Sequence, residues 1–200
     1  VYQLSGRRRS IAQTNISLCF SHLTASEQEY MLRQTFANNG IGIIETAMAW
    51  WSSRDTLSHR VSIEGGKLIE EAQAQGRGVL LVGAHYTSLD LGGILLAPSY
   101  PYYATYQRHG NALIDTIIRR GRLHHLPGMV EREDIRQVMK LLKQGKIVWL
   151  APDQDVGPDR SVFAPFFGVD AATTPIVSRL AAATGAKVGR LYTSPSPRDS

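Results

Sequence analysis

Short apolar runs alternate with longer amphipathic stretches along most of this chain. Four of these runs are short enough, and apolar enough, to be buried strands: residues 79–83, 102–106, 146–151 and 187–191. Helical patterns lie between and before them, at 66–75, 91–96, 111–120, 132–144 and 174–183, the last with Thr174 as its expected cap. Strands that alternate with helices typically form a parallel sheet. The pattern therefore predicts an α/β fold with a mainly parallel central sheet flanked by helices.

A helical N-terminal segment precedes this alternation. Residues 7–20 have the pattern of one helix, and a second begins near Thr24, where Glu27 fits a capping box, and runs through Trp51. Apolar residues cover more than one face of 41–51, which is too much for an exposed helix. We expect this part to pack under the domain rather than against lipid, with Trp50 and Trp51 as candidates for a membrane interface.

Length, charge and cysteine content narrow the class of protein. A chain of 200 residues suits one domain with its own core, and a net charge of +5 favours an anionic partner: an acidic protein, a phospholipid surface or nucleic acid. The single cysteine, Cys19, cannot form an internal disulfide, lies in an apolar run that suits the core, and is consistent with a reducing compartment. No window approaches the 18 to 20 or so apolar residues that a spanning helix needs.

The first candidate site lies where the strand at 79–83 leads into the helix at 91–96. His85 follows the strand and Asp90 lies five residues later. Two residues five apart on one regular helix point in different directions, so the pair can meet only if His85 is on the loop and Asp90 is in the first helical turn. An imidazole held by a carboxylate can activate a nucleophile. The alternative is a capped helix with an incidental histidine.

A basic segment follows the strand at 102–106. Between 107 and 125 the only acid is Asp115, against the cations and histidines Arg108, His109, Arg119, Arg120, Arg122, His124 and His125. Sites of α/β proteins lie at strand ends, and a guanidinium can hold phosphate or carboxylate through two parallel bonds. Position alone leaves Arg119, Arg120 and Arg122 as rivals for that role.

A second acidic candidate follows the strand at 146–151. Asp153 and Asp155 stand in the run Pro152-Asp153-Gln154-Asp155-Val156-Gly157-Pro158. Two carboxylates two residues apart could bind a divalent cation, as in D-x-D glycosyltransferases. They could equally cap the turn through Asx-type hydrogen bonds.

Several of these segments together resemble one family. His85 to Asp90 matches the H-x4-D/E signature of membrane acyltransferases, 9–20 resembles R-x-I-A-x-x-N-x-x-L-C-F, and 152–158 matches P-D-x-D-x-G-P. With 161–168 and 171–175, these motifs make the chain similar to the bacterial lipid A biosynthesis acyltransferases, most of all the lauroyl transferases. The resemblance covers roughly 7–191, and we expect 1–191 to form a single acyltransferase domain.

The resemblance implies a reaction and its residues. His85, oriented by Asp90, would take a proton from a substrate hydroxyl that attacks the thioester of an acyl carrier, and backbone N–H groups at the start of the helix at 91–96 would stabilise the oxyanion. The spacing between His85 and Arg122 resembles that of the family's substrate-binding segment, so Arg122 is the preferred substrate-binding arginine. Asp153 matches an aspartate of the family's functional set. No metal or other cofactor is expected.

The resemblance also implies partners and a location. The donor would be acyl-acyl carrier protein and the acceptor a phosphorylated lipid A precursor, at a membrane surface on the cytoplasmic face of the bacterial inner membrane and without nucleic acid. Since the family carries an N-terminal membrane anchor and the chain starts with Val1, we expect truncation at both ends. The polar tail at 192–200, with two prolines, matches nothing in the family.

Three alternatives stay open. A glycerophosphate-type lipid acyltransferase shares the histidine motif but lacks P-D-x-D-x-G-P. A metal-dependent D-x-D glycosyltransferase would need Mn²⁺ or Mg²⁺ at Asp153 and Asp155. A non-catalytic basic protein would need the arginines alone and gives no reason for His85 and Asp90 at a strand end.

Overall fold

The computed structural model describes residue 2 and residues 6–52 and 62–191; the predictions for the tail at 192–200 lie outside them. Five parallel strands form the main sheet in the order β3-β2-β4-β1-β7. They are β1 (Val79–Val82), β2 (Tyr102–Tyr106), β3 (Gly128–Glu131), β4 (Ile147–Leu150) and β7 (Lys187–Arg190). The expected α/β class with a mainly parallel sheet is confirmed.

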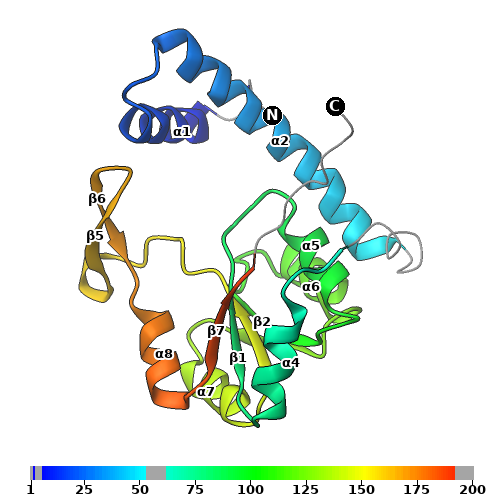
Figure 1. Ribbon diagram of the computed structural model, residues 1–200. Helices are drawn as coiled ribbons and strands as arrows, with labels where there is room; N and C mark the ends of the chain where they lie inside the picture. The colour runs from blue at the N-terminus through cyan, green and yellow to red at the C-terminus, as the bar shows by residue number, and fades with distance from the viewer. Residues whose placement is uncertain (1, 3–5, 53–61, 192–200) are drawn as a thin grey trace.

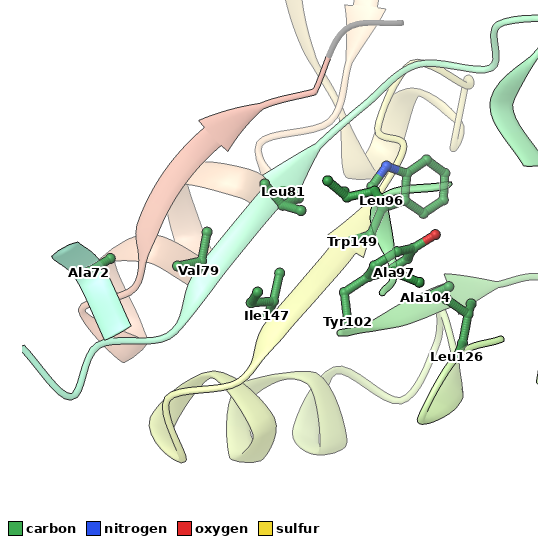
Figure 2. Close-up of a cluster of buried hydrophobic side chains, with 10 residues drawn as sticks. All are labelled: Ala72, Val79, Leu81, Leu96, Ala97, Tyr102, Ala104, Leu126, Ile147 and Trp149. Atoms are coloured by element: carbon green, nitrogen blue, oxygen red, sulfur yellow. The ribbon is translucent and has the colours of Figure 1, made fainter. Parts of the chain in front are cut away.

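Helices cover both faces of this sheet. They are α4 (Gly66–Ala74), α5 (Leu89–Leu96), α6 (Ala112–Leu123), α7 (Ile135–Lys143) and α8 (Ile176–Thr184). Successive residues of a strand point to opposite faces, so Val79 and Leu81 join a cluster with α4 and α5, whereas Leu80 joins a cluster with α7 and α8. Figure 2 shows the first cluster, in which Trp149 and Tyr102 are the largest side chains. Burial on both faces explains why β1 and β4 are continuous apolar runs.

The helical N-terminal segment is confirmed as α1 (Gly6–Cys19) and α2 (Ala25–Trp51). The predicted capping box is present: the Glu27 amide donates to the Thr24 hydroxyl, and the Thr24 amide donates to the Glu27 carboxylate. Cys19 ends α1 and is partly buried. In Figure 1, α2 crosses the end of the molecule at which the strands finish, and it packs against α5 and α6.

The expectation that 41–51 is packed under the domain is only half right. Gly42, Ala49 and Trp50 face the domain: a Cβ on Gly42 would lie 2.7 Å from the Thr87 carbonyl oxygen, and Trp50 packs against Gly121. The opposite face of α2 exposes the apolar side chains Ile41, Ile43, Ile44, Met48 and Trp51. In the part of the chain that the structure describes, no helix is both long enough and apolar enough to cross a membrane.

Two features were not predicted from the sequence. β3 is an edge strand, and a short 3-10 helix, η1 (Pro158–Arg160), leads into an antiparallel hairpin of β5 (Val162–Phe166) and β6 (Val169–Thr173). Within the described part of the chain, this hairpin pairs with no other strand. The expected cap of the last helix is also wrong. Thr174 lies one residue too early, because Pro175 occupies the cap position of α8 and no side chain bonds there.

Candidate active site

His85 and Asp153 form the central pair of the site. The His85 ring Nδ1 lies 2.7 Å from one carboxylate oxygen of Asp153, and the His85 backbone N–H donates to the other at 2.8 Å. The two side chains are 44% and 37% exposed, so solvent and substrate can reach them. Two bonds from one residue to both oxygens fix the imidazole relative to the carboxylate. We call this pair the dyad.

Strand register explains why these residues meet. β1 and β4 are parallel neighbours, with Val82 opposite Leu150 at their carboxyl ends. His85 comes three residues after Val82, and Asp153 comes three residues after Leu150. Because carboxyl ends of adjacent parallel strands share one edge of a sheet, equal spacing brings the two side chains together.

Asp90 does not orient His85, contrary to the sequence-based expectation. Asp90 is in the first turn of α5, as predicted, but both of its carboxylate oxygens accept from Arg122, at 2.6 Å from Nε and 3.0 Å from Nη2. Arg122 lies in the last turn of α6, and the two side chains are only 22% and 17% exposed. The preferred anion clamp is therefore already bonded to a carboxylate, and the expected pairing is replaced by two pairs, His85–Asp153 and Arg122–Asp90.

A pocket lies beside the Arg122–Asp90 pair, between α5, α6 and the sheet. Its lining includes Asp90, Arg122, Tyr102 and Trp149, together with apolar side chains. Burial raises the pKa of the Tyr102 hydroxyl, and the negative charge of Asp90 raises it further, while Arg122 lowers it. The phenol therefore stays protonated. The Trp149 indole N–H is buried, and its close approach to the chain requires a glycine at 83, where a Cβ would lie 2.7 Å from that nitrogen.

Several residues of the basic segment after β2 are held by hydrogen bonds within the domain. The buried Asp115 accepts from the His109 amide, and Asn111 caps α6 by accepting from two amides of its first turn. Arg119 donates to the Tyr106 hydroxyl and lies over that ring, 5.5 Å from its centroid. Arg108 and Arg120 are exposed. The rival arginines thus differ in their surroundings, and their roles in substrate binding stay predictions.

The two aspartates after β4 have separate partners. Asp153 holds His85, whereas Asp155 accepts from the Gly157 amide at 2.8 Å, an Asx-type turn of the kind considered above. Among the described residues, no three His, Cys, Asp or Glu side chains are grouped closely enough to hold a metal ion.

The sequence did single out His85, Asp153, Asp90 and Arg122, but it did not indicate which of them would pair. The equal spacing of His85 and Asp153 from their strand ends was the one available signal.

Comparison with known proteins decides the family. A model of the bacterial lipid A biosynthesis acyltransferases matches residues 1–191. The chain belongs to this family. The resemblance inferred from the motifs is therefore confirmed.

Curated members of the family include close relatives. The chain is 40% identical over 181 residues to a lipid A biosynthesis palmitoleoyltransferase of Escherichia coli, with 88% of this chain and 59% of that protein covered. It is 39% identical over 181 residues to the lauroyltransferase of the same organism, covering 90% of this chain and 59% of the relative. A myristoyltransferase is 29% identical over 195 residues, with 94% and 58% covered. The chain thus spans about three-fifths of the length of the relatives it matches.

Proposed function

We propose that this chain transfers a fatty acyl group from acyl-acyl carrier protein to a hydroxyl of a phosphorylated lipid A precursor. Family membership supports acyl transfer in lipid A biosynthesis, and the relatives are named for different acyl groups within this one biosynthesis. The observation that carries the proposal is the dyad at the carboxyl edge of the sheet, where His85 is both held and exposed.

We infer the proton positions from the partner of the His85 ring Nδ1. Because Nδ1 faces the Asp153 carboxylate, the Nδ1–H tautomer is favoured, and Nε2 is left as the base. Nε2 takes the proton of the acceptor hydroxyl as its oxygen attacks the thioester carbonyl, and the imidazolium that forms is stabilised by Asp153. The tetrahedral intermediate then expels the carrier thiolate, which the imidazolium can protonate. No covalent acyl-enzyme is needed.

Oxyanion stabilisation, substrate binding and contact with the membrane are the other roles that the reaction requires. The start of α5 directs backbone N–H groups and the positive end of the helix dipole toward the loop that holds His85, so it can stabilise the oxyanion. Arg108, which is exposed just after the carboxyl end of β2, and the exposed Arg120 of α6 suit an acidic carrier protein and a phosphorylated acceptor. The basic net charge and the exposed apolar face of α2 support work at the cytoplasmic face of the inner membrane.

The test is an acyl-transfer assay with the purified gene product, acyl-acyl carrier protein and a phosphorylated lipid A precursor. We expect His85→Ala to lower kcat by about 10²- to 10⁴-fold, the usual contribution of a general base. His22→Ala is the matched control, because His22 is exposed on the turn between α1 and α2 and should leave kcat unchanged. Near-normal turnover by His85→Ala would remove the dyad from the reaction. Turnover with glycerol phosphate in place of the lipid A precursor would favour the glycerophosphate-type alternative.

A further inference from the structure

The β5–β6 hairpin carries apolar side chains on both of its faces. Phe166 lies opposite Val169 in the register, and both are exposed on the same face as Val162. Phe163, 65% exposed, points to the other face, and Phe167 lies at the turn. A two-stranded hairpin is marginal in water unless something covers its apolar side chains. Exposed aromatic residues on an unsupported hairpin therefore indicate a surface that another phase or molecule covers.

The hairpin is linked directly to the dyad. Val162, the first residue of β5, lies nine positions after Asp153. That connection is braced internally, since the Ser161 hydroxyl donates to the Gly157 carbonyl at 2.9 Å and Asp155 accepts from the Gly157 amide. At the other end of the hairpin, the Phe167 ring packs 5.1 Å from the ring of Phe20, at the end of α1. Figure 1 shows the hairpin extending away from the main sheet, on the side where α1 lies.

We propose that the β5–β6 hairpin inserts its aromatic side chains into the surface of a lipid bilayer. A protein partner that adds a strand to a hairpin, or packs on it, covers one edge or one face. Here the exposed apolar residues lie on both faces and at the turn, as with Phe163, Phe166 and Phe167. A fluid interface can cover both faces of the hairpin at once. Aromatic side chains are also well suited to the boundary between lipid headgroups and acyl chains.

Charge and neighbouring surfaces favour the same occupant. Arg160 precedes the hairpin, and Arg7, Arg8 and Arg9 are exposed in the first turn of α1, the helix whose other end is followed by Phe20 at the hairpin turn. Basic side chains near an anionic leaflet add to apolar insertion. α2, which exposes a second set of apolar side chains, crosses the end of the molecule at which the strands finish (Figure 1). Docking there would place the dyad beside the bilayer, which matters only if the acceptor is a lipid and so rests on the proposed function.

The experiment reads insertion at single positions. An environment-sensitive nitrobenzoxadiazole label is attached to Phe163→Cys and, separately, to Phe166→Cys of the gene product, each with Cys19→Ser. Gln144→Cys is the control, because it is exposed and caps α7 just before β4, at the opposite edge of the sheet. Vesicles of phosphatidylethanolamine and phosphatidylglycerol are then added. We expect a blue shift with increased emission at both hairpin positions and no change at Gln144→Cys.

Each outcome decides the proposal. No shift at either position, or a shift at only one face of the hairpin, overturns it in favour of a water-exposed hairpin or a one-sided protein contact. In the unlabelled variant with Phe163→Ser and Phe166→Ser, the affinity for the vesicles should fall by at least about tenfold, because burying one aromatic side chain contributes about that factor. His85→Ala should insert normally. Insertion is measured without turnover, so failed acyl transfer and failed insertion are separate results.

Discussion

Neutralising Arg122 should destabilise the fold more than neutralising both members of its ion pair. Arg122 bonds both oxygens of Asp90, at 2.6 Å and 3.0 Å, with side chains that are 22% and 17% exposed. Two opposite charges about 4 Å apart attract by roughly 4 kcal/mol at an effective dielectric constant of about 20, before the cost of desolvation is subtracted. Removing one partner of a buried pair costs about 3–5 kcal/mol. Because Asp90 keeps some contact with water, we expect about 2–3 kcal/mol for Arg122→Gln.

The measurement is a double-mutant cycle with Arg122→Gln, Asp90→Asn and both together, followed by thermal unfolding. For a chain of this size, about 2–4 °C of Tm corresponds to 1 kcal/mol, so Arg122→Gln should lower Tm by about 4 to 12 °C. The double variant should regain much of this loss, because no uncompensated charge is left. A coupling free energy below about 0.5 kcal/mol, within the range of independent sites, would refute the view that these two side chains act as a pair.

The same variants separate a structural role from substrate binding. If Arg122 also binds the acceptor, its partner holds the guanidinium in place, and Arg122→Gln should raise KM for the phosphorylated acceptor even in the stable double variant. Asp90→Asn should leave that KM unchanged or decrease it, because the guanidinium of Arg122 keeps its charge and is released from its partner. Equal KM values in all four proteins would show that the pair is purely structural.

Three further predictions test the site and its supports. Asp153→Asn should lower kcat by about 10²- to 10⁴-fold, because the amide no longer holds the imidazole in the basic tautomer. Asp155→Asn alters only a turn, so kcat in a steady-state assay should stay nearly unchanged, both with and without EDTA. Gly42→Ala should destabilise the protein by about 1–3 kcal/mol through a clash with the Thr87 backbone. Gly40→Ala, with open space around it, should stabilise α2 by about 0.5–1 kcal/mol, and thermal unfolding that ranks the two variants otherwise would contradict this placement of α2. The pKa of Glu27 is lowered, chiefly by its hydrogen bond with the hydroxyl of its capping partner Thr24, so the cap contributes its full stability at pH values above the ordinary glutamate pKa. The difference in Tm between the unmodified protein and Glu27→Ala should therefore shrink as the pH falls through the lowered pKa.

The sequence predicted the buried strands better than the exposed ones. β1 and β4 are covered on both faces, so their apolar runs are continuous and easy to recognise. β3 is an edge strand in which only Val130 is buried, and its sequence carries no such run. The β5–β6 hairpin was missed for a related reason: its apolar residues are exposed and Pro165 interrupts β5, which argues against a strand.

The site was predicted as a set of residues but not as an arrangement. His85 and Asp153 are recognisable because each follows a buried strand, and Asp90 is recognisable as an acid in a first helical turn. Their partners depend on which strands are neighbours, and the order β3-β2-β4-β1-β7 is set by tertiary packing. Local spacing favoured Asp90 as the partner of His85. The pairing of β1 with β4 instead delivered a carboxylate from 68 positions further along the chain.

That long-range origin of the dyad makes its assembly a late event in folding. A ribosome that has released the segment through β1 has exposed an imidazole with no acid to hold it, because Asp153 follows β4. The imidazole becomes oriented only when β4 docks alongside β1 in the correct register, and a slip of one residue would turn the wrong side chains toward this edge of the sheet. Partly folded chains should therefore be unable to consume reactive thioesters, and recovery of turnover after dilution from denaturant would time the closing of the sheet.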